Sequence, residues 1–324
     1  TQLGIHFWPE FSFVAGFKID YLSPTIYLTD LLLIAYLILS WKKPTINPLL
    51  MILIFINTIF SAEPLLSLFF WSKLVLYILF FLSLLKTPKL KKLIYAPLLA
   101  STILIIFIQF TQLFLQKSIG GPLYFFGERA FNFYTPNIAK INLHHLGAII
   151  RPYSIFSHPN SLAGYLLIVL VIQKWPKAIK VLISAAIALT FSKIAIFTLF
   201  LLEIKNTKIL RKITLVALLA GFLPLLVNFT NLNYTPDHSF LTRAYMGFPT
   251  TEIIKQNFFT GTGLRAFIPS LAQHLAPSHL NLSSLQPVHS LPLLILSELG
   301  IFGLVLLATI VKKFKNPLLI QILL

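Results

Sequence analysis

The sequence contains no cysteine and few charged residues. Without cysteine the chain has no disulfide, no reactive thiol and no thiolate ligand for a metal, which excludes thiol-based redox chemistry. Only 11% of the residues are charged, whereas 57% are hydrophobic, and the mean hydropathy is +0.84. A soluble globule of 324 residues would lack the polar surface to cover this apolar material. The composition therefore predicts an integral membrane protein.

Long apolar segments recur along the chain, and short basic clusters separate them. A helix that crosses the hydrocarbon core needs about 20 apolar residues. We expect an all-α polytopic bundle, a single integral membrane domain over residues 1–324, with about nine to ten spans. The predicted spans are residues 24–41, 46–62, 65–85, 94–116, 161–175, 181–204, 213–229 and 291–311, with a truncated span after Pro317. Both ends of the chain are expected to be truncated, so the full protein should contain more helices.

Most lysines and arginines lie in five clusters between these segments. Short cytoplasmic loops are enriched in Lys and Arg, so the clusters predict the orientation of the chain. They lie at residues 42–43, 86–92, 174–180, 205–212 and 312–315. The net charge of +17 is therefore mainly an orientation signal, and no nucleic-acid partner is expected. Functional cations are expected among the others, which are Lys18, Lys73, Lys117, Arg129, Lys140, Arg151, Lys193, Arg243, Lys255 and Arg265.

One segment, residues 181–204, has a basic cluster at both ends. A single crossing would place one cluster outside, so we predict two short helices, residues 181–190 and 194–204, with a turn at Phe191-Ser192-Lys193. Lys193 would then lie near or inside the outer half of the bilayer, where a central charge costs roughly 2.5 to 3.5 kcal/mol without a partner or water. The alternative is a lysine that extends to the outer headgroups.

Two long segments, residues 117–160 and 230–290, are predicted to be outer loops, and the second precedes the last complete span. They contain nearly all the histidines and most of the outer arginines. Because long connections often carry function, we expect an active site on the outer face. The first 23 residues form a third outer segment, whose aromatic character suits the membrane interface.

The first candidate cluster is residues 151–160, directly before the span that starts at Ser161. Pro159 disfavours helix at His158, and Asn160 is suited to cap the helix that follows. Arg151 close to a helix N-terminus favours a phosphate site. A capped helix start at the membrane surface is an equal alternative for His158 and Asn160.

The larger outer loop holds the other candidates. Arg243 begins an aromatic, amphipathic stretch, and Gly261 and Gly263 follow it. A tight turn explains these glycines equally well, and a plain surface charge explains Arg243. His289 lies at the junction with the last span, where a histidine can take a proton from a sugar hydroxyl, although histidine is also common at membrane interfaces. Further on, Gly300-x-x-Gly303 indicates a close helix-packing surface.

Several enzyme classes are excluded by missing motifs. The sequence has no H-E-x-x-H, no P-loop, no G-x-S-x-G and no acidic pair in an outer loop for glycoside hydrolysis. The outer segments contain few carboxylates, so we expect neither a metal nor a cofactor. A cationic, imidazole-rich outer face suits a substrate with a diphosphate leaving group.

In these residues the chain resembles the bacterial O-antigen ligase family, which includes O-antigen polymerase-like proteins and some protein-glycosylating ligases. Residues 151–160 resemble the start of a central span in that family, and Thr190-Phe191-Ser192-Lys193 resembles its Thr-x-Ser-Arg turn. Arg243 is similar to the arginine that opens its large outer loop, with Gly261-Thr262-Gly263 following. The most specific feature is His289-Ser290 before Gly300-Ile301-Phe302-Gly303. Lysine replaces the family's arginine at position 193, and an ammonium lacks the bidentate guanidinium fork.

The resemblance implies transfer of a glycan from a polyprenyl (undecaprenyl) diphosphate carrier to a hydroxyl of a glycan, lipid or protein acceptor. The implied place is the outer side of the cytoplasmic (inner) membrane, facing the periplasm or cell exterior, in O-antigen, lipopolysaccharide or other surface polysaccharide ligation or polymerisation. It implies a catalytic His289, as base or acceptor-orienting group, together with Arg243. It assigns the diphosphate or substrate to Lys193, Arg151, His158, Asn160, Gly261 and Gly263.

Two other classes of function stay open. A transporter or flippase for lipid-linked sugars would show internal repeats and discontinuous helices around a midplane site. The sequence shows no convincing repeat, and a long loop on one face favours an enzyme. A non-catalytic assembly scaffold is the third possibility, and it predicts that single polar substitutions in the outer loops are harmless.

Overall fold

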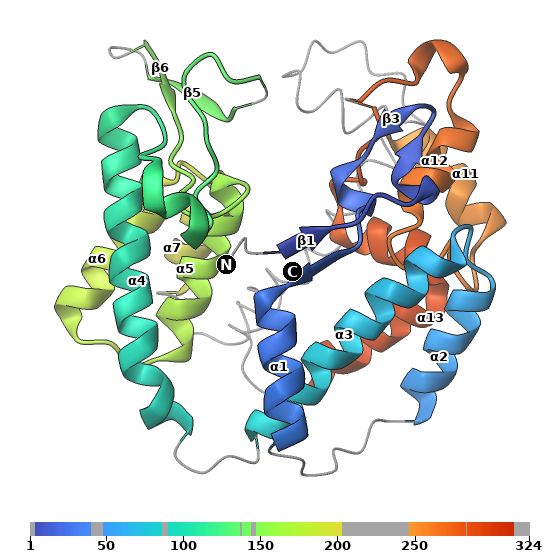
Figure 1. The fold of residues 1–324 in the computed structure, drawn as a ribbon, viewed down its shortest axis with the longest axis horizontal. Helices are drawn as coiled ribbons and strands as arrows, with labels where there is room; N and C mark the ends of the chain where they lie inside the picture. Colours follow the sequence, from blue (N-terminus) through green and yellow to red (C-terminus); the bar gives the residue numbers. More distant parts are fainter. Residues whose placement is uncertain are drawn as a thin grey trace. The chain divides into compact units, whose positions relative to one another are not determined.

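The computed structural model describes residues 4–39, 48–85, 90–136, 138–143, 147–202, 246–282 and 284–313. The chain divides into two compact units, whose elements can be followed by colour in Figure 1. The central unit is built mainly from residues 84–212, and the terminal unit mainly from residues 5–83 and 213–315. Helices dominate both units.

The terminal unit begins with an ordered segment that is not helical. Strand β1 (Gly4–His6) pairs with β4 (Thr25–Tyr27), and β2 (Phe13–Val14) pairs antiparallel with β3 (Phe17–Lys18). The short 3-10 helices η1 (Glu10–Ser12) and η2 (Asp20–Leu22) connect them. The predicted span from residue 24 is therefore corrected, because residues 25–27 bond to β1 and helix α1 starts only at Leu28. The expectation of an all-α chain is corrected with it.

The apolar helices of the terminal unit are α1 (Leu28–Leu39), α2 (Pro48–Ile59), α3 (Pro64–Leu85) and α13 (Leu291–Lys313). The described part of the predicted loop 230–290 contains α11 (Gly247–Gln256), α12 (Phe267–His274) and the 3-10 helix η4 (Pro277–His279). Helices α11 and α12 pack on each other and on α13. The core includes the fully buried Leu22, Leu66, Ile253, Phe267 and Leu293, so the N-terminal segment, α3 and the loop helices share one core.

The central unit contains α4 (Leu90–Leu115), α5 (Pro159–Ile172), α6 (Lys177–Leu189) and α7 (Lys193–Leu202), drawn green to yellow in Figure 1. Helix α5 packs against the other three. The predicted outer loop 117–160 forms the 3-10 helix η3 (Gly121–Phe126) and an antiparallel hairpin of β5 (Lys140–Leu143) and β6 (Gly147–Ile150).

Two helical segments, Pro64–Leu84 and Leu93–Leu115, are long and apolar enough to cross a membrane. Five shorter apolar helices accompany them: Leu28–Leu39, Pro48–Ile59, Pro159–Ile172, Lys193–Leu202 and Leu291–Val305. Large apolar side chains point outward from several of these helices, as at Leu39, Phe114 and Phe200, which are 87%, 88% and 70% exposed. Such surfaces suit contact with lipid. The expected nine to ten spans are not confirmed by the described residues, and residues 213–229 and those after Pro317 lie outside them.

The predicted break inside residues 181–204 is confirmed. Helix α6 ends at Leu189, α7 begins at Lys193, and the two helices contact each other. Phe191 between them has φ of +53°. A residue other than glycine rarely adopts this left-handed conformation, and it cannot continue a right-handed helix.

Candidate active site

Arg151 of the central unit joins the C-terminal end of α6 to the N-terminal end of α5. Its Nε donates a hydrogen bond to the carbonyl of Thr190 at 2.9 Å, and its Nη2 donates to Oδ1 of Asn160 at 2.7 Å. Asn160 lies in the first turn of α5, and Thr190 lies just before α7 begins at Lys193. One guanidinium thus links the cap of α6, just before the turn into α7, to the start of α5.

The backbone that carries Arg151 is held by Gln112 of α4. The Oε1 atom of Gln112 accepts the N–H groups of Tyr153 and Ser154 at 3.0 and 2.6 Å, and its Nε2 donates to the Ser154 carbonyl at 3.0 Å. Ser154 has φ of +51°, and its hydroxyl donates to the carbonyl of Ile105. The Arg151 N–H donates to the Ala139 carbonyl at 3.0 Å. These bonds bind the turn before α5 to helix α4.

The same glutamine connects to a buried carboxylate that organises the outer loop. Glu128 is 1% exposed, and its Oε1 accepts Nε2 of Gln112 and the N–H of Ile119 at 2.9 and 2.6 Å. Its Oε2 accepts the N–H of Gly120 at 2.7 Å. Both oxygens are thus used within the loop.

His158, rather than Asn160, caps helix α5. His158 has extended backbone angles, and its Nδ1 accepts the N–H of Asn160 at 3.1 Å. Pro159 occupies the first helical position, where its fixed φ and missing N–H are suited to a helix start. This moves the start before the predicted Ser161 and corrects the predicted cap. The Asn160 side chain instead positions the guanidinium of Arg151.

The charge at this cluster has no acidic counterpart. Partial burial lowers the pKa of the Arg151 guanidinium, which nevertheless stays protonated. Within the described residues Arg151 forms no ion pair, since its side-chain acceptors are a carbonyl and an amide oxygen. Lys193 is exposed at the start of α7. The N-terminus of α5 and the two cations Arg151 and Lys193 favour an anion, and a phosphate group fits this chemistry.

In the terminal unit, helix α13 is broken at Gly300, which has φ of 66° and ψ of −166°. The N–H groups of Thr262 and Gly263 donate to the carbonyls of Ser297 and Glu298, both at 2.9 Å. The predicted uninterrupted span is therefore corrected. Irregular backbone at membrane depth occurs only where it is buried in protein or lines a wet cavity, and here a loop supplies the missing donors.

The glycines of this region allow close backbone packing. A Cβ atom on Gly261 would collide with the Glu298 carbonyl, and one on Gly263 with the Ser61 side chain. A Cβ atom on Gly300 would collide with the Phe259 carbonyl. All three glycines have positive φ. The tight-turn alternative therefore explains Gly261 and Gly263, and their contact with substrate stays a prediction. Gly300 lets a loop approach, where a neighbouring helix was expected.

Asn57 of α2 holds this turn in place. Its Nδ2 donates to the carbonyls of Thr260 and Glu298, both at 2.8 Å. Its Oδ1 accepts from Trp71 Nε1 at 2.8 Å and from the Leu264 N–H at 3.1 Å. The side chain is fully buried at 0% exposure. The sequence reasoning missed Asn57, although an amide inside the apolar helix α2 was a usable signal.

His289 lies where the sequence predicts it. It is exposed, directly before Ser290, whose carbonyl accepts the N–H of Leu294 in the first turn of α13. Arg243 lies outside the described residues. The structure thus brings Arg151, His158, Asn160 and Lys193 together in the central unit, whereas Gly261, Gly263 and His289 belong to the terminal unit.

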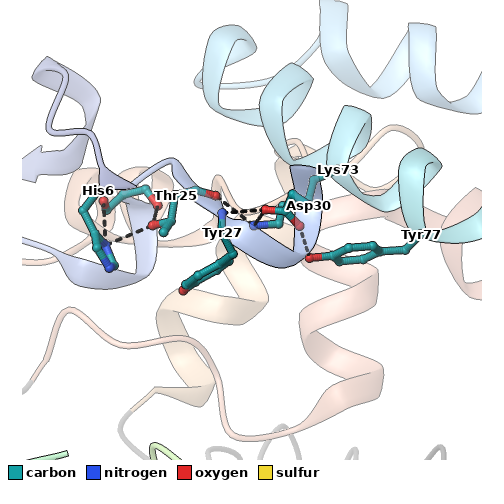
Figure 2. A network of polar contacts seen from close by, with 7 residues as sticks. His6, Thr25, Tyr27, Asp30, Lys73 and Tyr77 are labelled. Atoms are coloured by element: carbon teal, nitrogen blue, oxygen red, sulfur yellow. Dashed lines mark hydrogen bonds and ion pairs between the residues drawn. The ribbon is translucent and has the colours of Figure 1, made fainter. Parts of the chain in front are cut away.

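The terminal unit also contains a polar network, shown in Figure 2, beside a pocket of about 430 Å³. Lys73 Nζ lies 2.9 Å from Oδ2 of Asp30 and donates to the Thr25 carbonyl at 2.8 Å. The Tyr77 hydroxyl donates to Oδ1 of Asp30 at 2.7 Å, and the N–H of Tyr27 donates to Oδ2 at 2.9 Å. The sequence placed Lys73 and Arg265, which also lines the pocket, among the cations that orientation leaves unexplained, but not in a common site.

Residues 161–308 match the family model for O-antigen ligase. Over this segment the chain is O-antigen ligase-like. The resemblance seen in the sequence is thereby confirmed, and the matched segment of this ligase-like chain contains Lys193, Gly261, Gly263 and His289, together with Arg243. The cluster around Arg151 precedes it. Neither the curated proteins nor the solved structures compared with the chain gave a match. Within the described residues no group of three or more His, Cys, Asp or Glu side chains forms a metal site, and metal independence stays a prediction.

Proposed function

We propose that this ligase-like chain transfers a glycan from a polyprenyl diphosphate carrier to an acceptor hydroxyl. The observation that carries the proposal is the positive charge of Arg151 at the start of α5, which forms no ion pair with the described residues. Lys193 at the start of α7 follows its acceptor Thr190 closely in the chain. Such a site stabilises the diphosphate of the donor and, more strongly, the charge that develops on it as it leaves.

The proposed reaction exchanges one bond of the anomeric carbon for another. The acceptor oxygen bonds to the anomeric carbon of the glycan while the bond from that carbon to the diphosphate oxygen breaks. The acceptor proton passes to His289, and the carrier leaves as polyprenyl diphosphate. Arg151 and Lys193 stabilise the leaving group, and the family resemblance adds Arg243 to them.

The supporting residues have distinct roles in this proposal. His158 starts α5, Asn160 orients the Arg151 guanidinium, and Gly261 and Gly263 hold the outer loop against α13. We place the reaction at the outer face of the cytoplasmic membrane, in O-antigen or other surface polysaccharide ligation or polymerisation. The acceptor is a glycan, a lipid or a protein.

A transporter or flippase for lipid-linked sugars is favoured by one observation, the discontinuity of α13. The carbonyls freed by that break already accept the N–H groups of Thr262 and Gly263. A substrate therefore does not have to satisfy them, which supports the transferase. Purified protein in liposomes, given lipid-linked donor and acceptor, distinguishes the two functions. A transferase forms glycosylated acceptor, whereas a transporter moves the donor across the bilayer without forming product.

Replacement of His289 tests the transferase directly. His289→Ala is expected to abolish surface glycan in cells and product formation in vitro, at a normal protein level. His274→Ala is the matched control, since His274 contacts Ser270 and Gln256 within the same unit and is expected to leave product formation intact. Wild-type product from His289→Ala would contradict the assignment.

A further inference from the structure

The pocket of the terminal unit contains two cations, Lys73 and Arg265, and Lys73 forms an ion pair with Asp30. The carboxylate of Asp30 uses both oxygens on Lys73, the Tyr77 hydroxyl and the Tyr27 N–H. Lys73 also bonds to the Thr25 carbonyl and lies over the Tyr27 ring, 4.4 Å from its centroid. The charges of Asp30 and Lys73 therefore neutralise each other, and neither is available to a ligand.

Arg265 is covered by aromatic rings instead of forming an ion pair with a carboxylate among the described residues. Its guanidinium lies 3.8 Å from the ring centroid of Tyr21 and 4.6 Å from that of Phe70, and its Nη1 donates to the Tyr21 carbonyl at 3.2 Å. Arg265 also interacts electrostatically with the buried carboxylate of Glu298. Asp20 adds a further negative charge to the lining. The pocket therefore differs from the Arg151 cluster, because one of its cations is paired with Asp30 and the other is stacked between two aromatic rings.

The pocket lies beside the middle of α3, a helix long and apolar enough to cross a membrane. Lys73 is about 13 Å from the first residue of this helix at 1.5 Å per residue. The backbone of β4 reaches the same level, because the Thr25 carbonyl accepts from Lys73. Irregular backbone at this depth lines either protein or a water-filled cavity, and an ionisable residue within a span marks a functional site. The folded N-terminal segment thus forms one wall of a recess beside α3.

This recess presents aromatic ring faces and uncharged polar groups to a ligand. Tyr21, Tyr27, Phe70 and Tyr77 line it, as does His6, whose Nδ1 lies 3.0 Å from the Thr25 hydroxyl. Figure 2 shows Tyr27 beside the Asp30–Lys73 pair, and the Lys73 ammonium covers one face of its ring. A tyrosine combines an apolar ring face with a polar hydroxyl.

This combination suits a sugar, whose C–H face packs on an aromatic ring while its hydroxyl groups bond to polar side chains. The volume of about 430 Å³ lies within the range of roughly 300–1,000 Å³ for small-molecule sites. We propose that the pocket is a saccharide site that takes an uncharged sugar unit on the ring of Tyr27. Sugar binding stands independently, and only the choice between acceptor sugar and donor glycan rests on the proposed transferase function.

Direct binding tests the site. The full chain in detergent micelles is mixed in turn with the methyl glycosides of glucose, galactose and N-acetylglucosamine, and binding is measured by saturation-transfer NMR. At least one glycoside is expected to bind wild type, and Tyr27→Ala should weaken that binding about tenfold or more. Tyr124→Ala is the matched control, because Tyr124 is an exposed tyrosine of the central unit. Failure of wild type to bind any of the three glycosides overturns the proposal, as does unchanged binding by Tyr27→Ala.

Tyr27→Phe is a second variant that is expected to fold, because it keeps the ring beneath Lys73 and removes only the hydroxyl. It should weaken glycoside binding by roughly threefold to tenfold. Binding equal to wild type would overturn the proposal even if Tyr27→Ala does not fold.

Transfer kinetics identify the source of the sugar. In an assay with purified chain, Tyr27→Phe is expected to raise the KM of the substrate whose sugar occupies the pocket. A raised acceptor KM assigns the site to the acceptor and a raised donor KM to the donor glycan, and both support a saccharide site. Unchanged KM for both substrates overturns it. Glycoside binding by a wild type that forms no product contradicts the transferase alone, whereas product without glycoside binding contradicts the pocket alone.

Discussion

The Arg151 cluster and the Lys73 pocket both place cations beside apolar helices, but they match the charge differently. Arg151 bonds to a carbonyl and an amide, so its positive charge is available to a ligand. Lys73 bonds to a carboxylate whose oxygens are already used by neighbours. An unmatched cation at helix N-termini attracts an anion, whereas a matched pair shapes a pocket. The difference supports our proposals of a diphosphate site in the central unit and a sugar site in the terminal unit.

The largest effect is expected from removing the acid of the matched pair. Asp30→Ala leaves Lys73 charged in an apolar helix, and loss of one partner of a buried pair costs roughly 3 to 5 kcal/mol. The thermal unfolding temperature in detergent should fall sharply. The double variant Asp30→Leu with Lys73→Met, which removes both charges, should recover most of the loss. An Asp30→Ala variant as stable as wild type would show that the Asp30–Lys73 ion pair does not stabilise the structure around the pocket.

A smaller loss of stability is expected from a glycine substitution in the terminal unit, whereas a glycine substitution in the central unit should cause none. Gly300→Ala forces a Cβ atom against the Phe259 carbonyl at positive φ, which should cost about 1 to 3 kcal/mol. Gly164→Ala in α5 meets open space and should leave stability unchanged or raise it by about 0.5 kcal/mol. Unfolding midpoints of the two variants measure the contrast. Equal midpoints would mean that the break in α13 tolerates a side chain.

Arg151→Lys tests the guanidinium geometry of the unmatched cluster. A lysine keeps the charge but cannot bond to Thr190 and Asn160 from two fixed nitrogens, so the KM for donor should rise about tenfold, with the acceptor KM unchanged. Arg129→Lys, at an exposed arginine of the same unit, is the control and should behave as wild type. An unaltered donor KM in Arg151→Lys would show that the guanidinium geometry of Arg151 is not needed to bind the donor.

The smallest effect should come from the exposed ion pair of the terminal unit. Lys255 and Glu252 lie 2.8 Å apart on the surface of α11, with Lys255 66% exposed. Lys255→Ala should change stability by less than about 0.5 kcal/mol, because solvent screens such pairs. A loss comparable to that of Asp30→Ala would show that burial does not separate the two pairs.

Features that depend on local sequence were predictable. The helix break before Lys193 follows from basic clusters on both sides, and the position of His289 follows from the end of a polar loop. The sequence predicts Asn160 as the cap of α5, because asparagine is a common cap. In the structure His158 forms the cap, and the Asn160 side chain accepts a hydrogen bond from Arg151.

Features that depend on distant partners could not be predicted. Asn57 bonds to Thr260 and Glu298, and Lys73 bonds to Thr25 and Asp30, across segments with no shared local pattern. The strands β1 and β4, the break in α13 and the pocket all depend on such bonds. Periodicity and hydropathy describe each segment by itself, so they cannot predict which distant residues bond to one another.

The central contrast is tested most directly by titrating the purified full chain with inorganic pyrophosphate, followed by phosphorus NMR at low salt. Wild type should bind, and binding should weaken as salt is added. Arg151→Gln should bind about tenfold or more weakly, and Tyr27→Ala should bind as wild type does. Pyrophosphate binding that survives in Arg151→Gln but is lost in Tyr27→Ala would contradict the assignment of the diphosphate to the central unit.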